Sequence, residues 1–292
     1  METSIETSPV RNWLKKMMAS TKKHNPYDQP SLDVFGVPLV QSLQIANTPI
    51  AYESKEIVIG LIPIIVAKCG SFLKDQGLYV EGVFRKSGSA RRIGELQQLF
   101  NSSSDHGIGF NWVGFNVHDA ANCLRRFLNY LPEPVIPSSF YASFRNISTK
   151  SDTVDITMRV KEYQYLIDQL PKINQHLLFY LLDLLALFSR YEEYTKMNSV
   201  SLASVFTPGI LLHPDHAMHP DQYKQSQKVV QFLIEYQDHF RLPKCQQSAP
   251  SKLNLYPTYH SREKQLLRAN TVPVLKHRME PNYELLQVIR NC

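Results

Sequence analysis

The sequence predicts an all-α fold, with one helical domain over residues 31–240 and flexible basic tails at residues 1–30 and 241–292. Three observations support this prediction. Apolar residues recur at helical spacing through the middle of the chain. Prolines and glycines separate these stretches at positions typical of helix ends. No segment alternates apolar and polar residues between hairpin turns, so we expect no sheet.

The expected helices follow one another from residue 56 to residue 240. Residues 56–76 are apolar and stop at Gly77, and residues 89–100 place their large apolar side chains on one side. Residues 117–130 repeat apolar positions at intervals of four, three and four. The following Leu-Pro-Glu-Pro must end that helix, because proline removes a backbone donor and restricts the residue before it. The remaining helices are expected at residues 138–145, 155–170, 172–190, 200–212 and 220–240.

The positive charge is concentrated in the two tails. Residues 1–30 hold five Lys and Arg against three Asp and Glu, residues 241–292 hold nine against three, and residues 31–240 have a net charge of −2. A nucleic-acid-binding groove would need basic and aromatic residues interleaved on the folded surface, so we expect no nucleic-acid partner. Solvation of the basic tails is the simpler interpretation, and transient contact with an anionic membrane is the alternative.

Other features predict a cytoplasmic protein, with recruitment to the cell cortex or plasma membrane left open. No stretch reaches the length of a membrane span, and the first residues lack the apolar core of a secretory signal. Four cysteines without a C-x-x-C pair favour a reducing compartment. Asp183 interrupts the apolar run at 177–188, either as a buried acid or as a cap or hydrogen-bonding partner of a neighbour.

Searches for familiar catalytic motifs find none. The sequence has no P-loop lysine, no G-x-S-x-G, no H-E-x-x-H and no dinucleotide glycine fingerprint. His213, Asp215, His216 and His219 form the nearest resemblance to a metal site. The prolines at both ends of that cluster make it a loop, and no second ligand pair follows at finger spacing. We therefore expect a polar loop and no metal.

The most informative segment is Gly-Val-Phe-Arg-Lys-Ser-Gly at residues 82–88, in a short loop between two expected helices. The glycines at its ends allow a tight turn or a close approach to a partner. If Phe84 anchors the loop by facing inward, Arg85 faces outward. An arginine presented in this way is a planar and always charged donor for phosphate oxygens.

The helix expected at residues 117–130 carries a second set of polar residues. At 100° per residue, Arg125 and Asn129 lie one turn apart beside the apolar stripe, whereas Arg126 points roughly away from the core. Arg125 and Asn129 therefore share a ledge that ends at the Leu-Pro-Glu-Pro turn.

These segments resemble the Rho GTPase-activating (RhoGAP) domain. The matching motifs are FGVPL (35–39), EGVFRKSG (81–88), CLRRFLNYLPEP (123–134) and KMNSVSLASVFTPGIL (196–211), which occur in the family's order and spacing. The resemblance covers residues 34–240 and implies a single RhoGAP-like helical domain. Within the family, the chain looks most similar to fungal members that act on Rho proteins controlling the actin cytoskeleton and cell wall.

The resemblance implies roles for particular residues. Arg85 stands at the position of the catalytic arginine finger. Arg125 replaces a lysine that steadies the finger loop and touches the GTPase. The family's second basic residue is Asn129 here, and Ser201 and Gly209 stand where members often have asparagine. The implied GTPase-binding residues are Gly82, Phe84, Lys86, Arg125, Asn129, Pro134, Ser201 and Gly209.

The function implied by the resemblance is activation of a GTP-bound Rho-family GTPase, which switches off Rho signalling. The protein would be no enzyme by itself and would need no cofactor of its own, because GTP and Mg²⁺ belong to the partner. Arg85 would supply a charge in trans. The alternative is an adaptor that binds the GTPase without catalysis, which the departures at Asn129 and Gly209 favour and Arg85 opposes.

Overall fold

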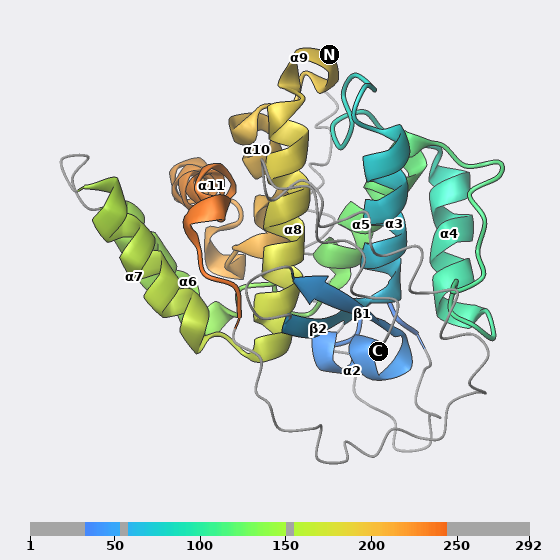
Figure 1. The fold of residues 1–292 in the computed structure, drawn as a ribbon, viewed down its shortest axis with the longest axis horizontal. Helices are drawn as coiled ribbons and strands as arrows, with labels where there is room; N and C mark the ends of the chain where they lie inside the picture. The colour runs from blue at the N-terminus through green and yellow to red at the C-terminus, as the bar shows by residue number, and fades with distance from the viewer. Residues whose placement is uncertain (1–32, 53–57, 150–154, 244–292) are drawn as a thin grey trace, which may run out of the picture.

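The computed structural model describes residues 33–52, 58–149 and 155–243, and its architecture is mostly helical, as expected (Figure 1). The helices are α2 (Leu39–Ile45), α3 (Ile64–Gln76), α4 (Ala90–Ser102), α5 (Val117–Tyr130), α6 (Tyr141–Ser148), α7 (Ile156–Gln169), α8 (Lys172–Arg190), α9 (Glu192–Thr195), α10 (Ser199–Ile210) and α11 (Pro220–Glu235). None of the helices in this part of the chain is long and apolar enough to cross a membrane. The predictions for both tails lie outside the described residues, except at residues 241–243.

A β-hairpin near the start of the domain corrects the prediction of no sheet. Strands β1 (Asn47–Tyr52) and β2 (Val58–Pro63) pair antiparallel, with Asn47 opposite Pro63, so the helix expected at 56–76 begins only at Ile64. The β2 segment is a short run rich in β-branched residues, which favour strands, and a run this short has no period that separates strand from buried helix.

Helix α8 forms the centre of the core, with bounds that match the expected 172–190 (Figure 1). Its residues from Leu177 to Phe188 are all buried, which is typical of a helix surrounded by other elements. It packs against β2, α10 and α11. At the crossing with β2, a Cβ on Gly60 would lie 2.3 Å from Nδ1 of His176, so only glycine allows this approach.

A buried ion pair joins α8 to α3. Nζ of Lys74 lies 3.1 Å from Oδ2 of Asp183, and both side chains are buried. Burial lowers the pKa of Lys74, because the charged amine loses water, although Asp183 opposes this shift. Asp183 is thus both a buried acid and the hydrogen-bonding partner of a neighbour, two of the roles that the sequence left open.

Two helix predictions need smaller corrections. The segment expected as a helix at 138–145 begins with a 3₁₀ turn at Ser138–Phe140, and α6 then extends to Ser148. The helix expected at 220–240 ends at Glu235 and continues as a 3₁₀ turn at Gln237–His239. Helix ends often tighten into such turns. Both segments are therefore helical as predicted, and only their bounds differ.

Candidate functional site

The loop between α3 and α4 (residues 77–89, the α3–α4 loop) is built around a buried phenylalanine. Phe84 is fully buried, and its ring meets Phe188 and Phe206 edge to face at centroid distances of 4.9 and 5.1 Å. Gly82 and Phe84 have positive φ angles of 75° and 70°. This backbone costs a non-glycine residue about 1–2 kcal/mol. Burial of the ring is worth about 1.5–3 kcal/mol and offsets that cost.

Arg85 follows this anchor and is exposed. Its N–H and that of Lys86 both donate to the carbonyl of Gly82, at 2.9 and 2.8 Å, and close a tight turn. The N–H of Gly82 donates to the carbonyl of Thr195 at 2.7 Å, which ties the loop to α9. Phe84 inward and Arg85 outward is the arrangement that the sequence predicts. The result is an exposed guanidinium on a fixed backbone.

Helix α5 holds the loop from the other side. Nη1 of Arg125 donates to the carbonyl of Phe84 at 2.8 Å, and Nδ2 of Asn122 donates to the carbonyl of Lys86 at 3.0 Å. Arg125 is half-buried, and burial lowers its pKa. The two bonds flank Arg85 in the sequence, so α5 fixes the backbone on both sides of it.

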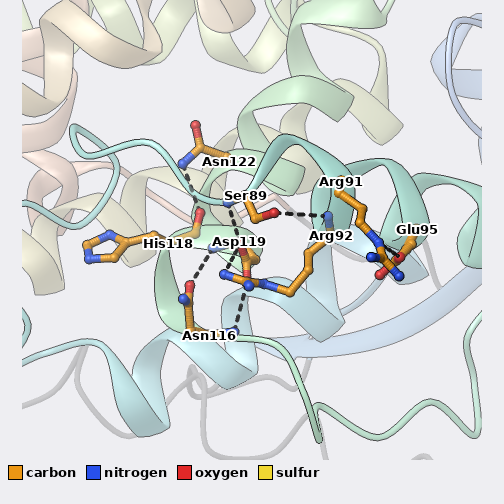
Figure 2. A network of polar contacts seen from close by, with 8 residues as sticks. All are labelled: Ser89, Arg91, Arg92, Glu95, Asn116, His118, Asp119 and Asn122. Atoms are coloured by element: carbon orange, nitrogen blue, oxygen red, sulfur yellow. Dashed lines mark hydrogen bonds and ion pairs between the residues drawn. The ribbon is translucent and has the colours of Figure 1, made fainter.

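A network around Asp119 fixes the end of the α3–α4 loop (Figure 2). The buried carboxylate of Asp119 accepts from the N–H of Ser89 at 2.8 Å, from Nε of Arg92 at 2.6 Å and from the N–H of Asn116 at 3.0 Å. Burial raises the pKa of Asp119, but the hydrogen bonds from Arg92, Asn116 and Ser89 outweigh it and lower the pKa. The carboxylate therefore links the starts of α4 and α5.

The sequence interpretation missed this role of Asp119, although a signal was present. Asn116 caps α5, and the side chains and backbones of Asn116 and Asp119 bond reciprocally in a capping box. The pattern of a cap residue with an acid three residues later is readable from sequence. Gly88 completes the arrangement, because a Cβ there would lie 2.6 Å from Oδ1 of Asp119. The partners Ser89 and Arg92 come from another helix and need the fold to be found.

Three of the other candidate residues meet at the seam between α5 and α10. A Cβ on Gly209 would lie 2.8 Å from Cβ of Leu128 and 3.2 Å from Oδ1 of Asn129, so glycine permits the close packing of the two helices. The N–H of Val135 donates to the carbonyl of Gly209 at 2.9 Å, next to the buried Pro134. These contacts give Gly209 and Pro134 a packing role, and their contact with a GTPase stays a prediction.

The remaining candidates lie nearer the ends of their elements. Ser201 donates its N–H to the capping side chain of Asn198 at 2.9 Å, in the first turn of α10. Lys86 is exposed, and its Nζ lies 3.2 Å from Oε1 of Glu81. Arg126, which was expected to point away from the core, is half-buried, and its Nη1 donates to Oε1 of Gln97 at 3.2 Å. Helix α4 packs against α5, so Arg126 lies at the contact between these two helices.

The histidine cluster at 213–219 lies in a 3₁₀ turn, Pro214–His216, and the start of α11. Nδ1 of His216 lies 3.1 Å from the hydroxyl of Tyr141 and 3.0 Å from Nη1 of Arg145. Burial and then Arg145 lower the pKa of His216. These are contacts of a polar loop, and the described residues contain no group of three or more His, Cys, Asp or Glu side chains placed to hold a metal ion.

Comparison with known proteins shows the family of this chain and agrees with its fold. The model of the RhoGAP domain matches residues 63–215, and the chain belongs to the RhoGAP domain family. Rho-GTPase-activating protein 5 of Schizosaccharomyces pombe is 39% identical over 80% of this chain and 63% of its own length. Rho-GTPase-activating protein BAG7 of Saccharomyces cerevisiae is 39% identical over 69% of this chain and 50% of its own length. The chain thus spans less than two thirds of either relative.

A solved structure supports the fold alone. The structure of human Rho GTPase activating protein 15 aligns with a TM-score of 0.56 and 21% identity, over 71% of this chain and 91% of that one. The helical architecture is therefore shared at low sequence identity.

Proposed function

We propose that this protein binds the GTP-loaded form of a Rho-family small GTPase and accelerates GTP hydrolysis, with Arg85 as the arginine finger. The geometry of the α3–α4 loop carries the proposal. Arg85 is exposed, Phe84 before it is buried, and Arg125 donates a hydrogen bond to the carbonyl of Phe84. Family membership and the printed names of the two yeast relatives support the choice of partner.

The proposed mechanism is electrostatic. The GTPase holds GTP, Mg²⁺ and the side chain that orients the attacking water, and Arg85 neutralises charge that develops on the transferring phosphoryl group. Arginine suits this role because its guanidinium is always charged and donates two parallel hydrogen bonds. A finger of this kind accelerates hydrolysis by about 10³–10⁵. In this mechanism no proton is transferred to or from the protein. The protein contributes the preorganised positive charge of the Arg85 guanidinium.

The surface that would receive the GTPase runs from the α3–α4 loop to the seam of α5 and α10. Lys86 and Arg85 lie exposed on the loop, and Asn129 is half-buried on the seam. The resemblance to fungal RhoGAP proteins extends the proposal to Rho signalling that controls actin and the cell wall. We further propose that the protein acts in the cytoplasm, with recruitment to the cell cortex or plasma membrane through transient contacts of the basic tails.

The test is single-turnover GTP hydrolysis by a panel of Rho, Rac and Cdc42-type GTPases, with the wild-type protein and with Arg85→Ala. We expect acceleration of at least one GTPase by the wild type and loss of most of it in the variant. Arg91→Ala is the matched control, because Arg91 is an exposed arginine six residues further on that pairs with Glu95. Equal acceleration by Arg85→Ala and wild type would show that Arg85 is no finger.

A non-catalytic adaptor is the second candidate function. It is favoured by Asn129, which puts a neutral side chain where the family has a basic one, and by Gly209, which is buried against α5. Binding of a GTP-loaded GTPase by the wild type without acceleration in the same panel would establish the adaptor and reject the activator.

A further inference from the structure

Three tyrosines form an exposed aromatic surface where the α3–α4 loop meets α9. The Tyr79 ring lies edge to face on Tyr194 and Tyr191, at centroid distances of 5.0 and 5.6 Å, and the Tyr191 and Tyr194 rings are 6.5 Å apart. Tyr79 is 69% exposed and Tyr194 is 53% exposed, whereas Tyr191 is half-buried. We call these three residues the tyrosine patch.

The fold places this patch next to Arg85. Tyr79 precedes Arg85 by six residues in the same loop. The hydrogen bond from the N–H of Gly82 to the carbonyl of Thr195 fastens that loop to the last residue of α9. Figure 1 shows α9 at the same end of the molecule as the C-terminal end of α3, from which the loop leaves. The patch is therefore joined to the loop that carries the exposed Arg85.

The exposure of these rings contrasts with the burial of their neighbours. Leu78, Val83 and Phe84 of the same loop are buried in the core, so the loop has enough apolar anchors without Tyr79. Tyrosine offers a large and rigid contact area with one polar end, and such side chains are enriched in the centres of protein interfaces. A cluster of exposed rings is therefore more typical of a binding surface than of a folding requirement.

The charges around the patch define the partner's chemistry. The patch is surrounded in sequence by exposed acids, and four exposed cations oppose them: Arg85, Lys86, Arg190 and Lys196. The acids are Asp75, Glu81, Glu192 and Glu193. Lys86 is paired with Glu81 and Arg190 with Asp238, and the proposed function directs Arg85 to the phosphoryl group. This leaves Asp75, Glu192 and Glu193 against Lys196. Aromatic faces attract cations, and nearby carboxylates strengthen this attraction. The surface thus fits a lysine or arginine side chain and disfavours an acidic one.

We propose that the tyrosine patch is a second contact surface for the GTPase that receives Arg85, and that it holds a basic side chain of that GTPase against the rings of Tyr79 and Tyr194. The inference rests on the proposed function. Tyr79 belongs to the α3–α4 loop that carries Arg85, and this places the patch within reach of a GTPase seated on that loop. The patch contacts the GTPase protein and not the reacting phosphate, so its binding energy is the same in the ground state and in the transition state. It therefore sets affinity and partner choice, not the rate of the bound complex.

The test measures KM and kcat separately for Tyr79→Ala and Tyr194→Ala, with GTP-loaded Rho, Rac and Cdc42-type GTPases. For the preferred GTPase we expect KM to rise about tenfold with each variant, a typical cost for truncating an aromatic interface residue, while kcat stays unchanged. Tyr79→Phe keeps the ring and should keep the wild-type KM. Tyr165→Ala is the matched control, because Tyr165 is also 69% exposed but lies on α7.

A charge variant makes the test independent of the rings. Glu192→Gln combined with Glu193→Gln leaves the tyrosines in place, and should raise KM and weaken its dependence on salt, because screened attraction has been removed.

The results distinguish failure of the tyrosine-patch inference from failure of the proposed function. If the wild type accelerates hydrolysis and the tyrosine variants match it in KM, the inference is wrong and the proposed function stands. A fall in kcat at unchanged KM would also overturn it, since the tyrosines would then only hold the loop. If the wild type binds without acceleration, the same comparison is made on Kd. Absence of both binding and acceleration would overturn the proposed function and this inference together.

Discussion

Replacing Arg125 with methionine tests whether α5 positions the arginine finger. Methionine keeps the length and apolar stem of the side chain but removes the donor that holds the carbonyl of Phe84 at 2.8 Å. A hydrogen bond from a charged group is worth about 1.5–3 kcal/mol. If all of this energy serves to fix Arg85 in the transition state, its loss lowers the hydrolysis rate of the bound complex by about 10- to 100-fold, at about 1.4 kcal/mol for each factor of ten.

The same substitution should change folding stability less than it changes rate. Arg125 is half-buried, so its removal also relieves part of the cost of desolvating a charge, which offsets part of the lost hydrogen bond. The assay is single-turnover hydrolysis at saturating concentrations of the activator, together with urea denaturation of the activator alone. Arg126→Met is the matched control, because Arg126 is the next residue of α5 but contacts Gln97. A wild-type rate with Arg125→Met would refute the positioning role.

Three further predictions concern the framework of the site, and each is checked by urea denaturation. Asp119→Asn should lower the free energy of unfolding by about 1.5–3 kcal/mol at pH 7. This difference in unfolding free energy between wild type and variant should be present above the ordinary carboxyl pKa of about 3.9. It should shrink in acid, because folding lowers the pKa of Asp119. A difference that persists in acid would contradict this explanation. Lys74→Met should cost about 3–5 kcal/mol by leaving Asp183 buried and charged, and the double variant Lys74→Met with Asp183→Leu should recover most of it; no recovery would reject the ion-pair explanation. Burial and then Lys172 lower the pKa of His176 to about 4, so stability should be full above about pH 6.5 and fall towards pH 4. In His176→Gln that fall should disappear, and its persistence would assign the acid sensitivity to another group.

The predictable parts of the fold are those with long and clear periodicity. Helix α5 was predicted to the residue because its apolar stripe is regular and a Pro-rich turn ends it. Helix α8 was predicted because it is apolar on all sides. The β-hairpin was missed because β2 spans only six residues, and a short apolar run has the same sequence pattern in a strand as in a helix.

The predictable part of the site is local, and the missed part is made by distant segments. Phe84 inward and Arg85 outward follows from neighbouring residues, and a ledge with Arg125 follows from helical geometry. The bond from Arg125 to Phe84 joins residues 41 positions apart, and the tyrosine patch joins α9 to the α3–α4 loop across more than one hundred residues. Such contacts depend on how helices pack, which single-sequence patterns do not specify.

The most direct test of the central claim compares two binding constants of Arg85→Ala with those of the wild type. One is measured with the preferred GTPase loaded with a non-hydrolysable GTP analogue, and the other with the same GTPase loaded with GDP and aluminium fluoride, which mimics the transferring phosphoryl group. A finger that acts on the transition state predicts nearly unchanged affinity for the first complex and a large loss for the second. If Arg85→Ala binds each of the two complexes as tightly as the wild type does, Arg85 is not an arginine finger.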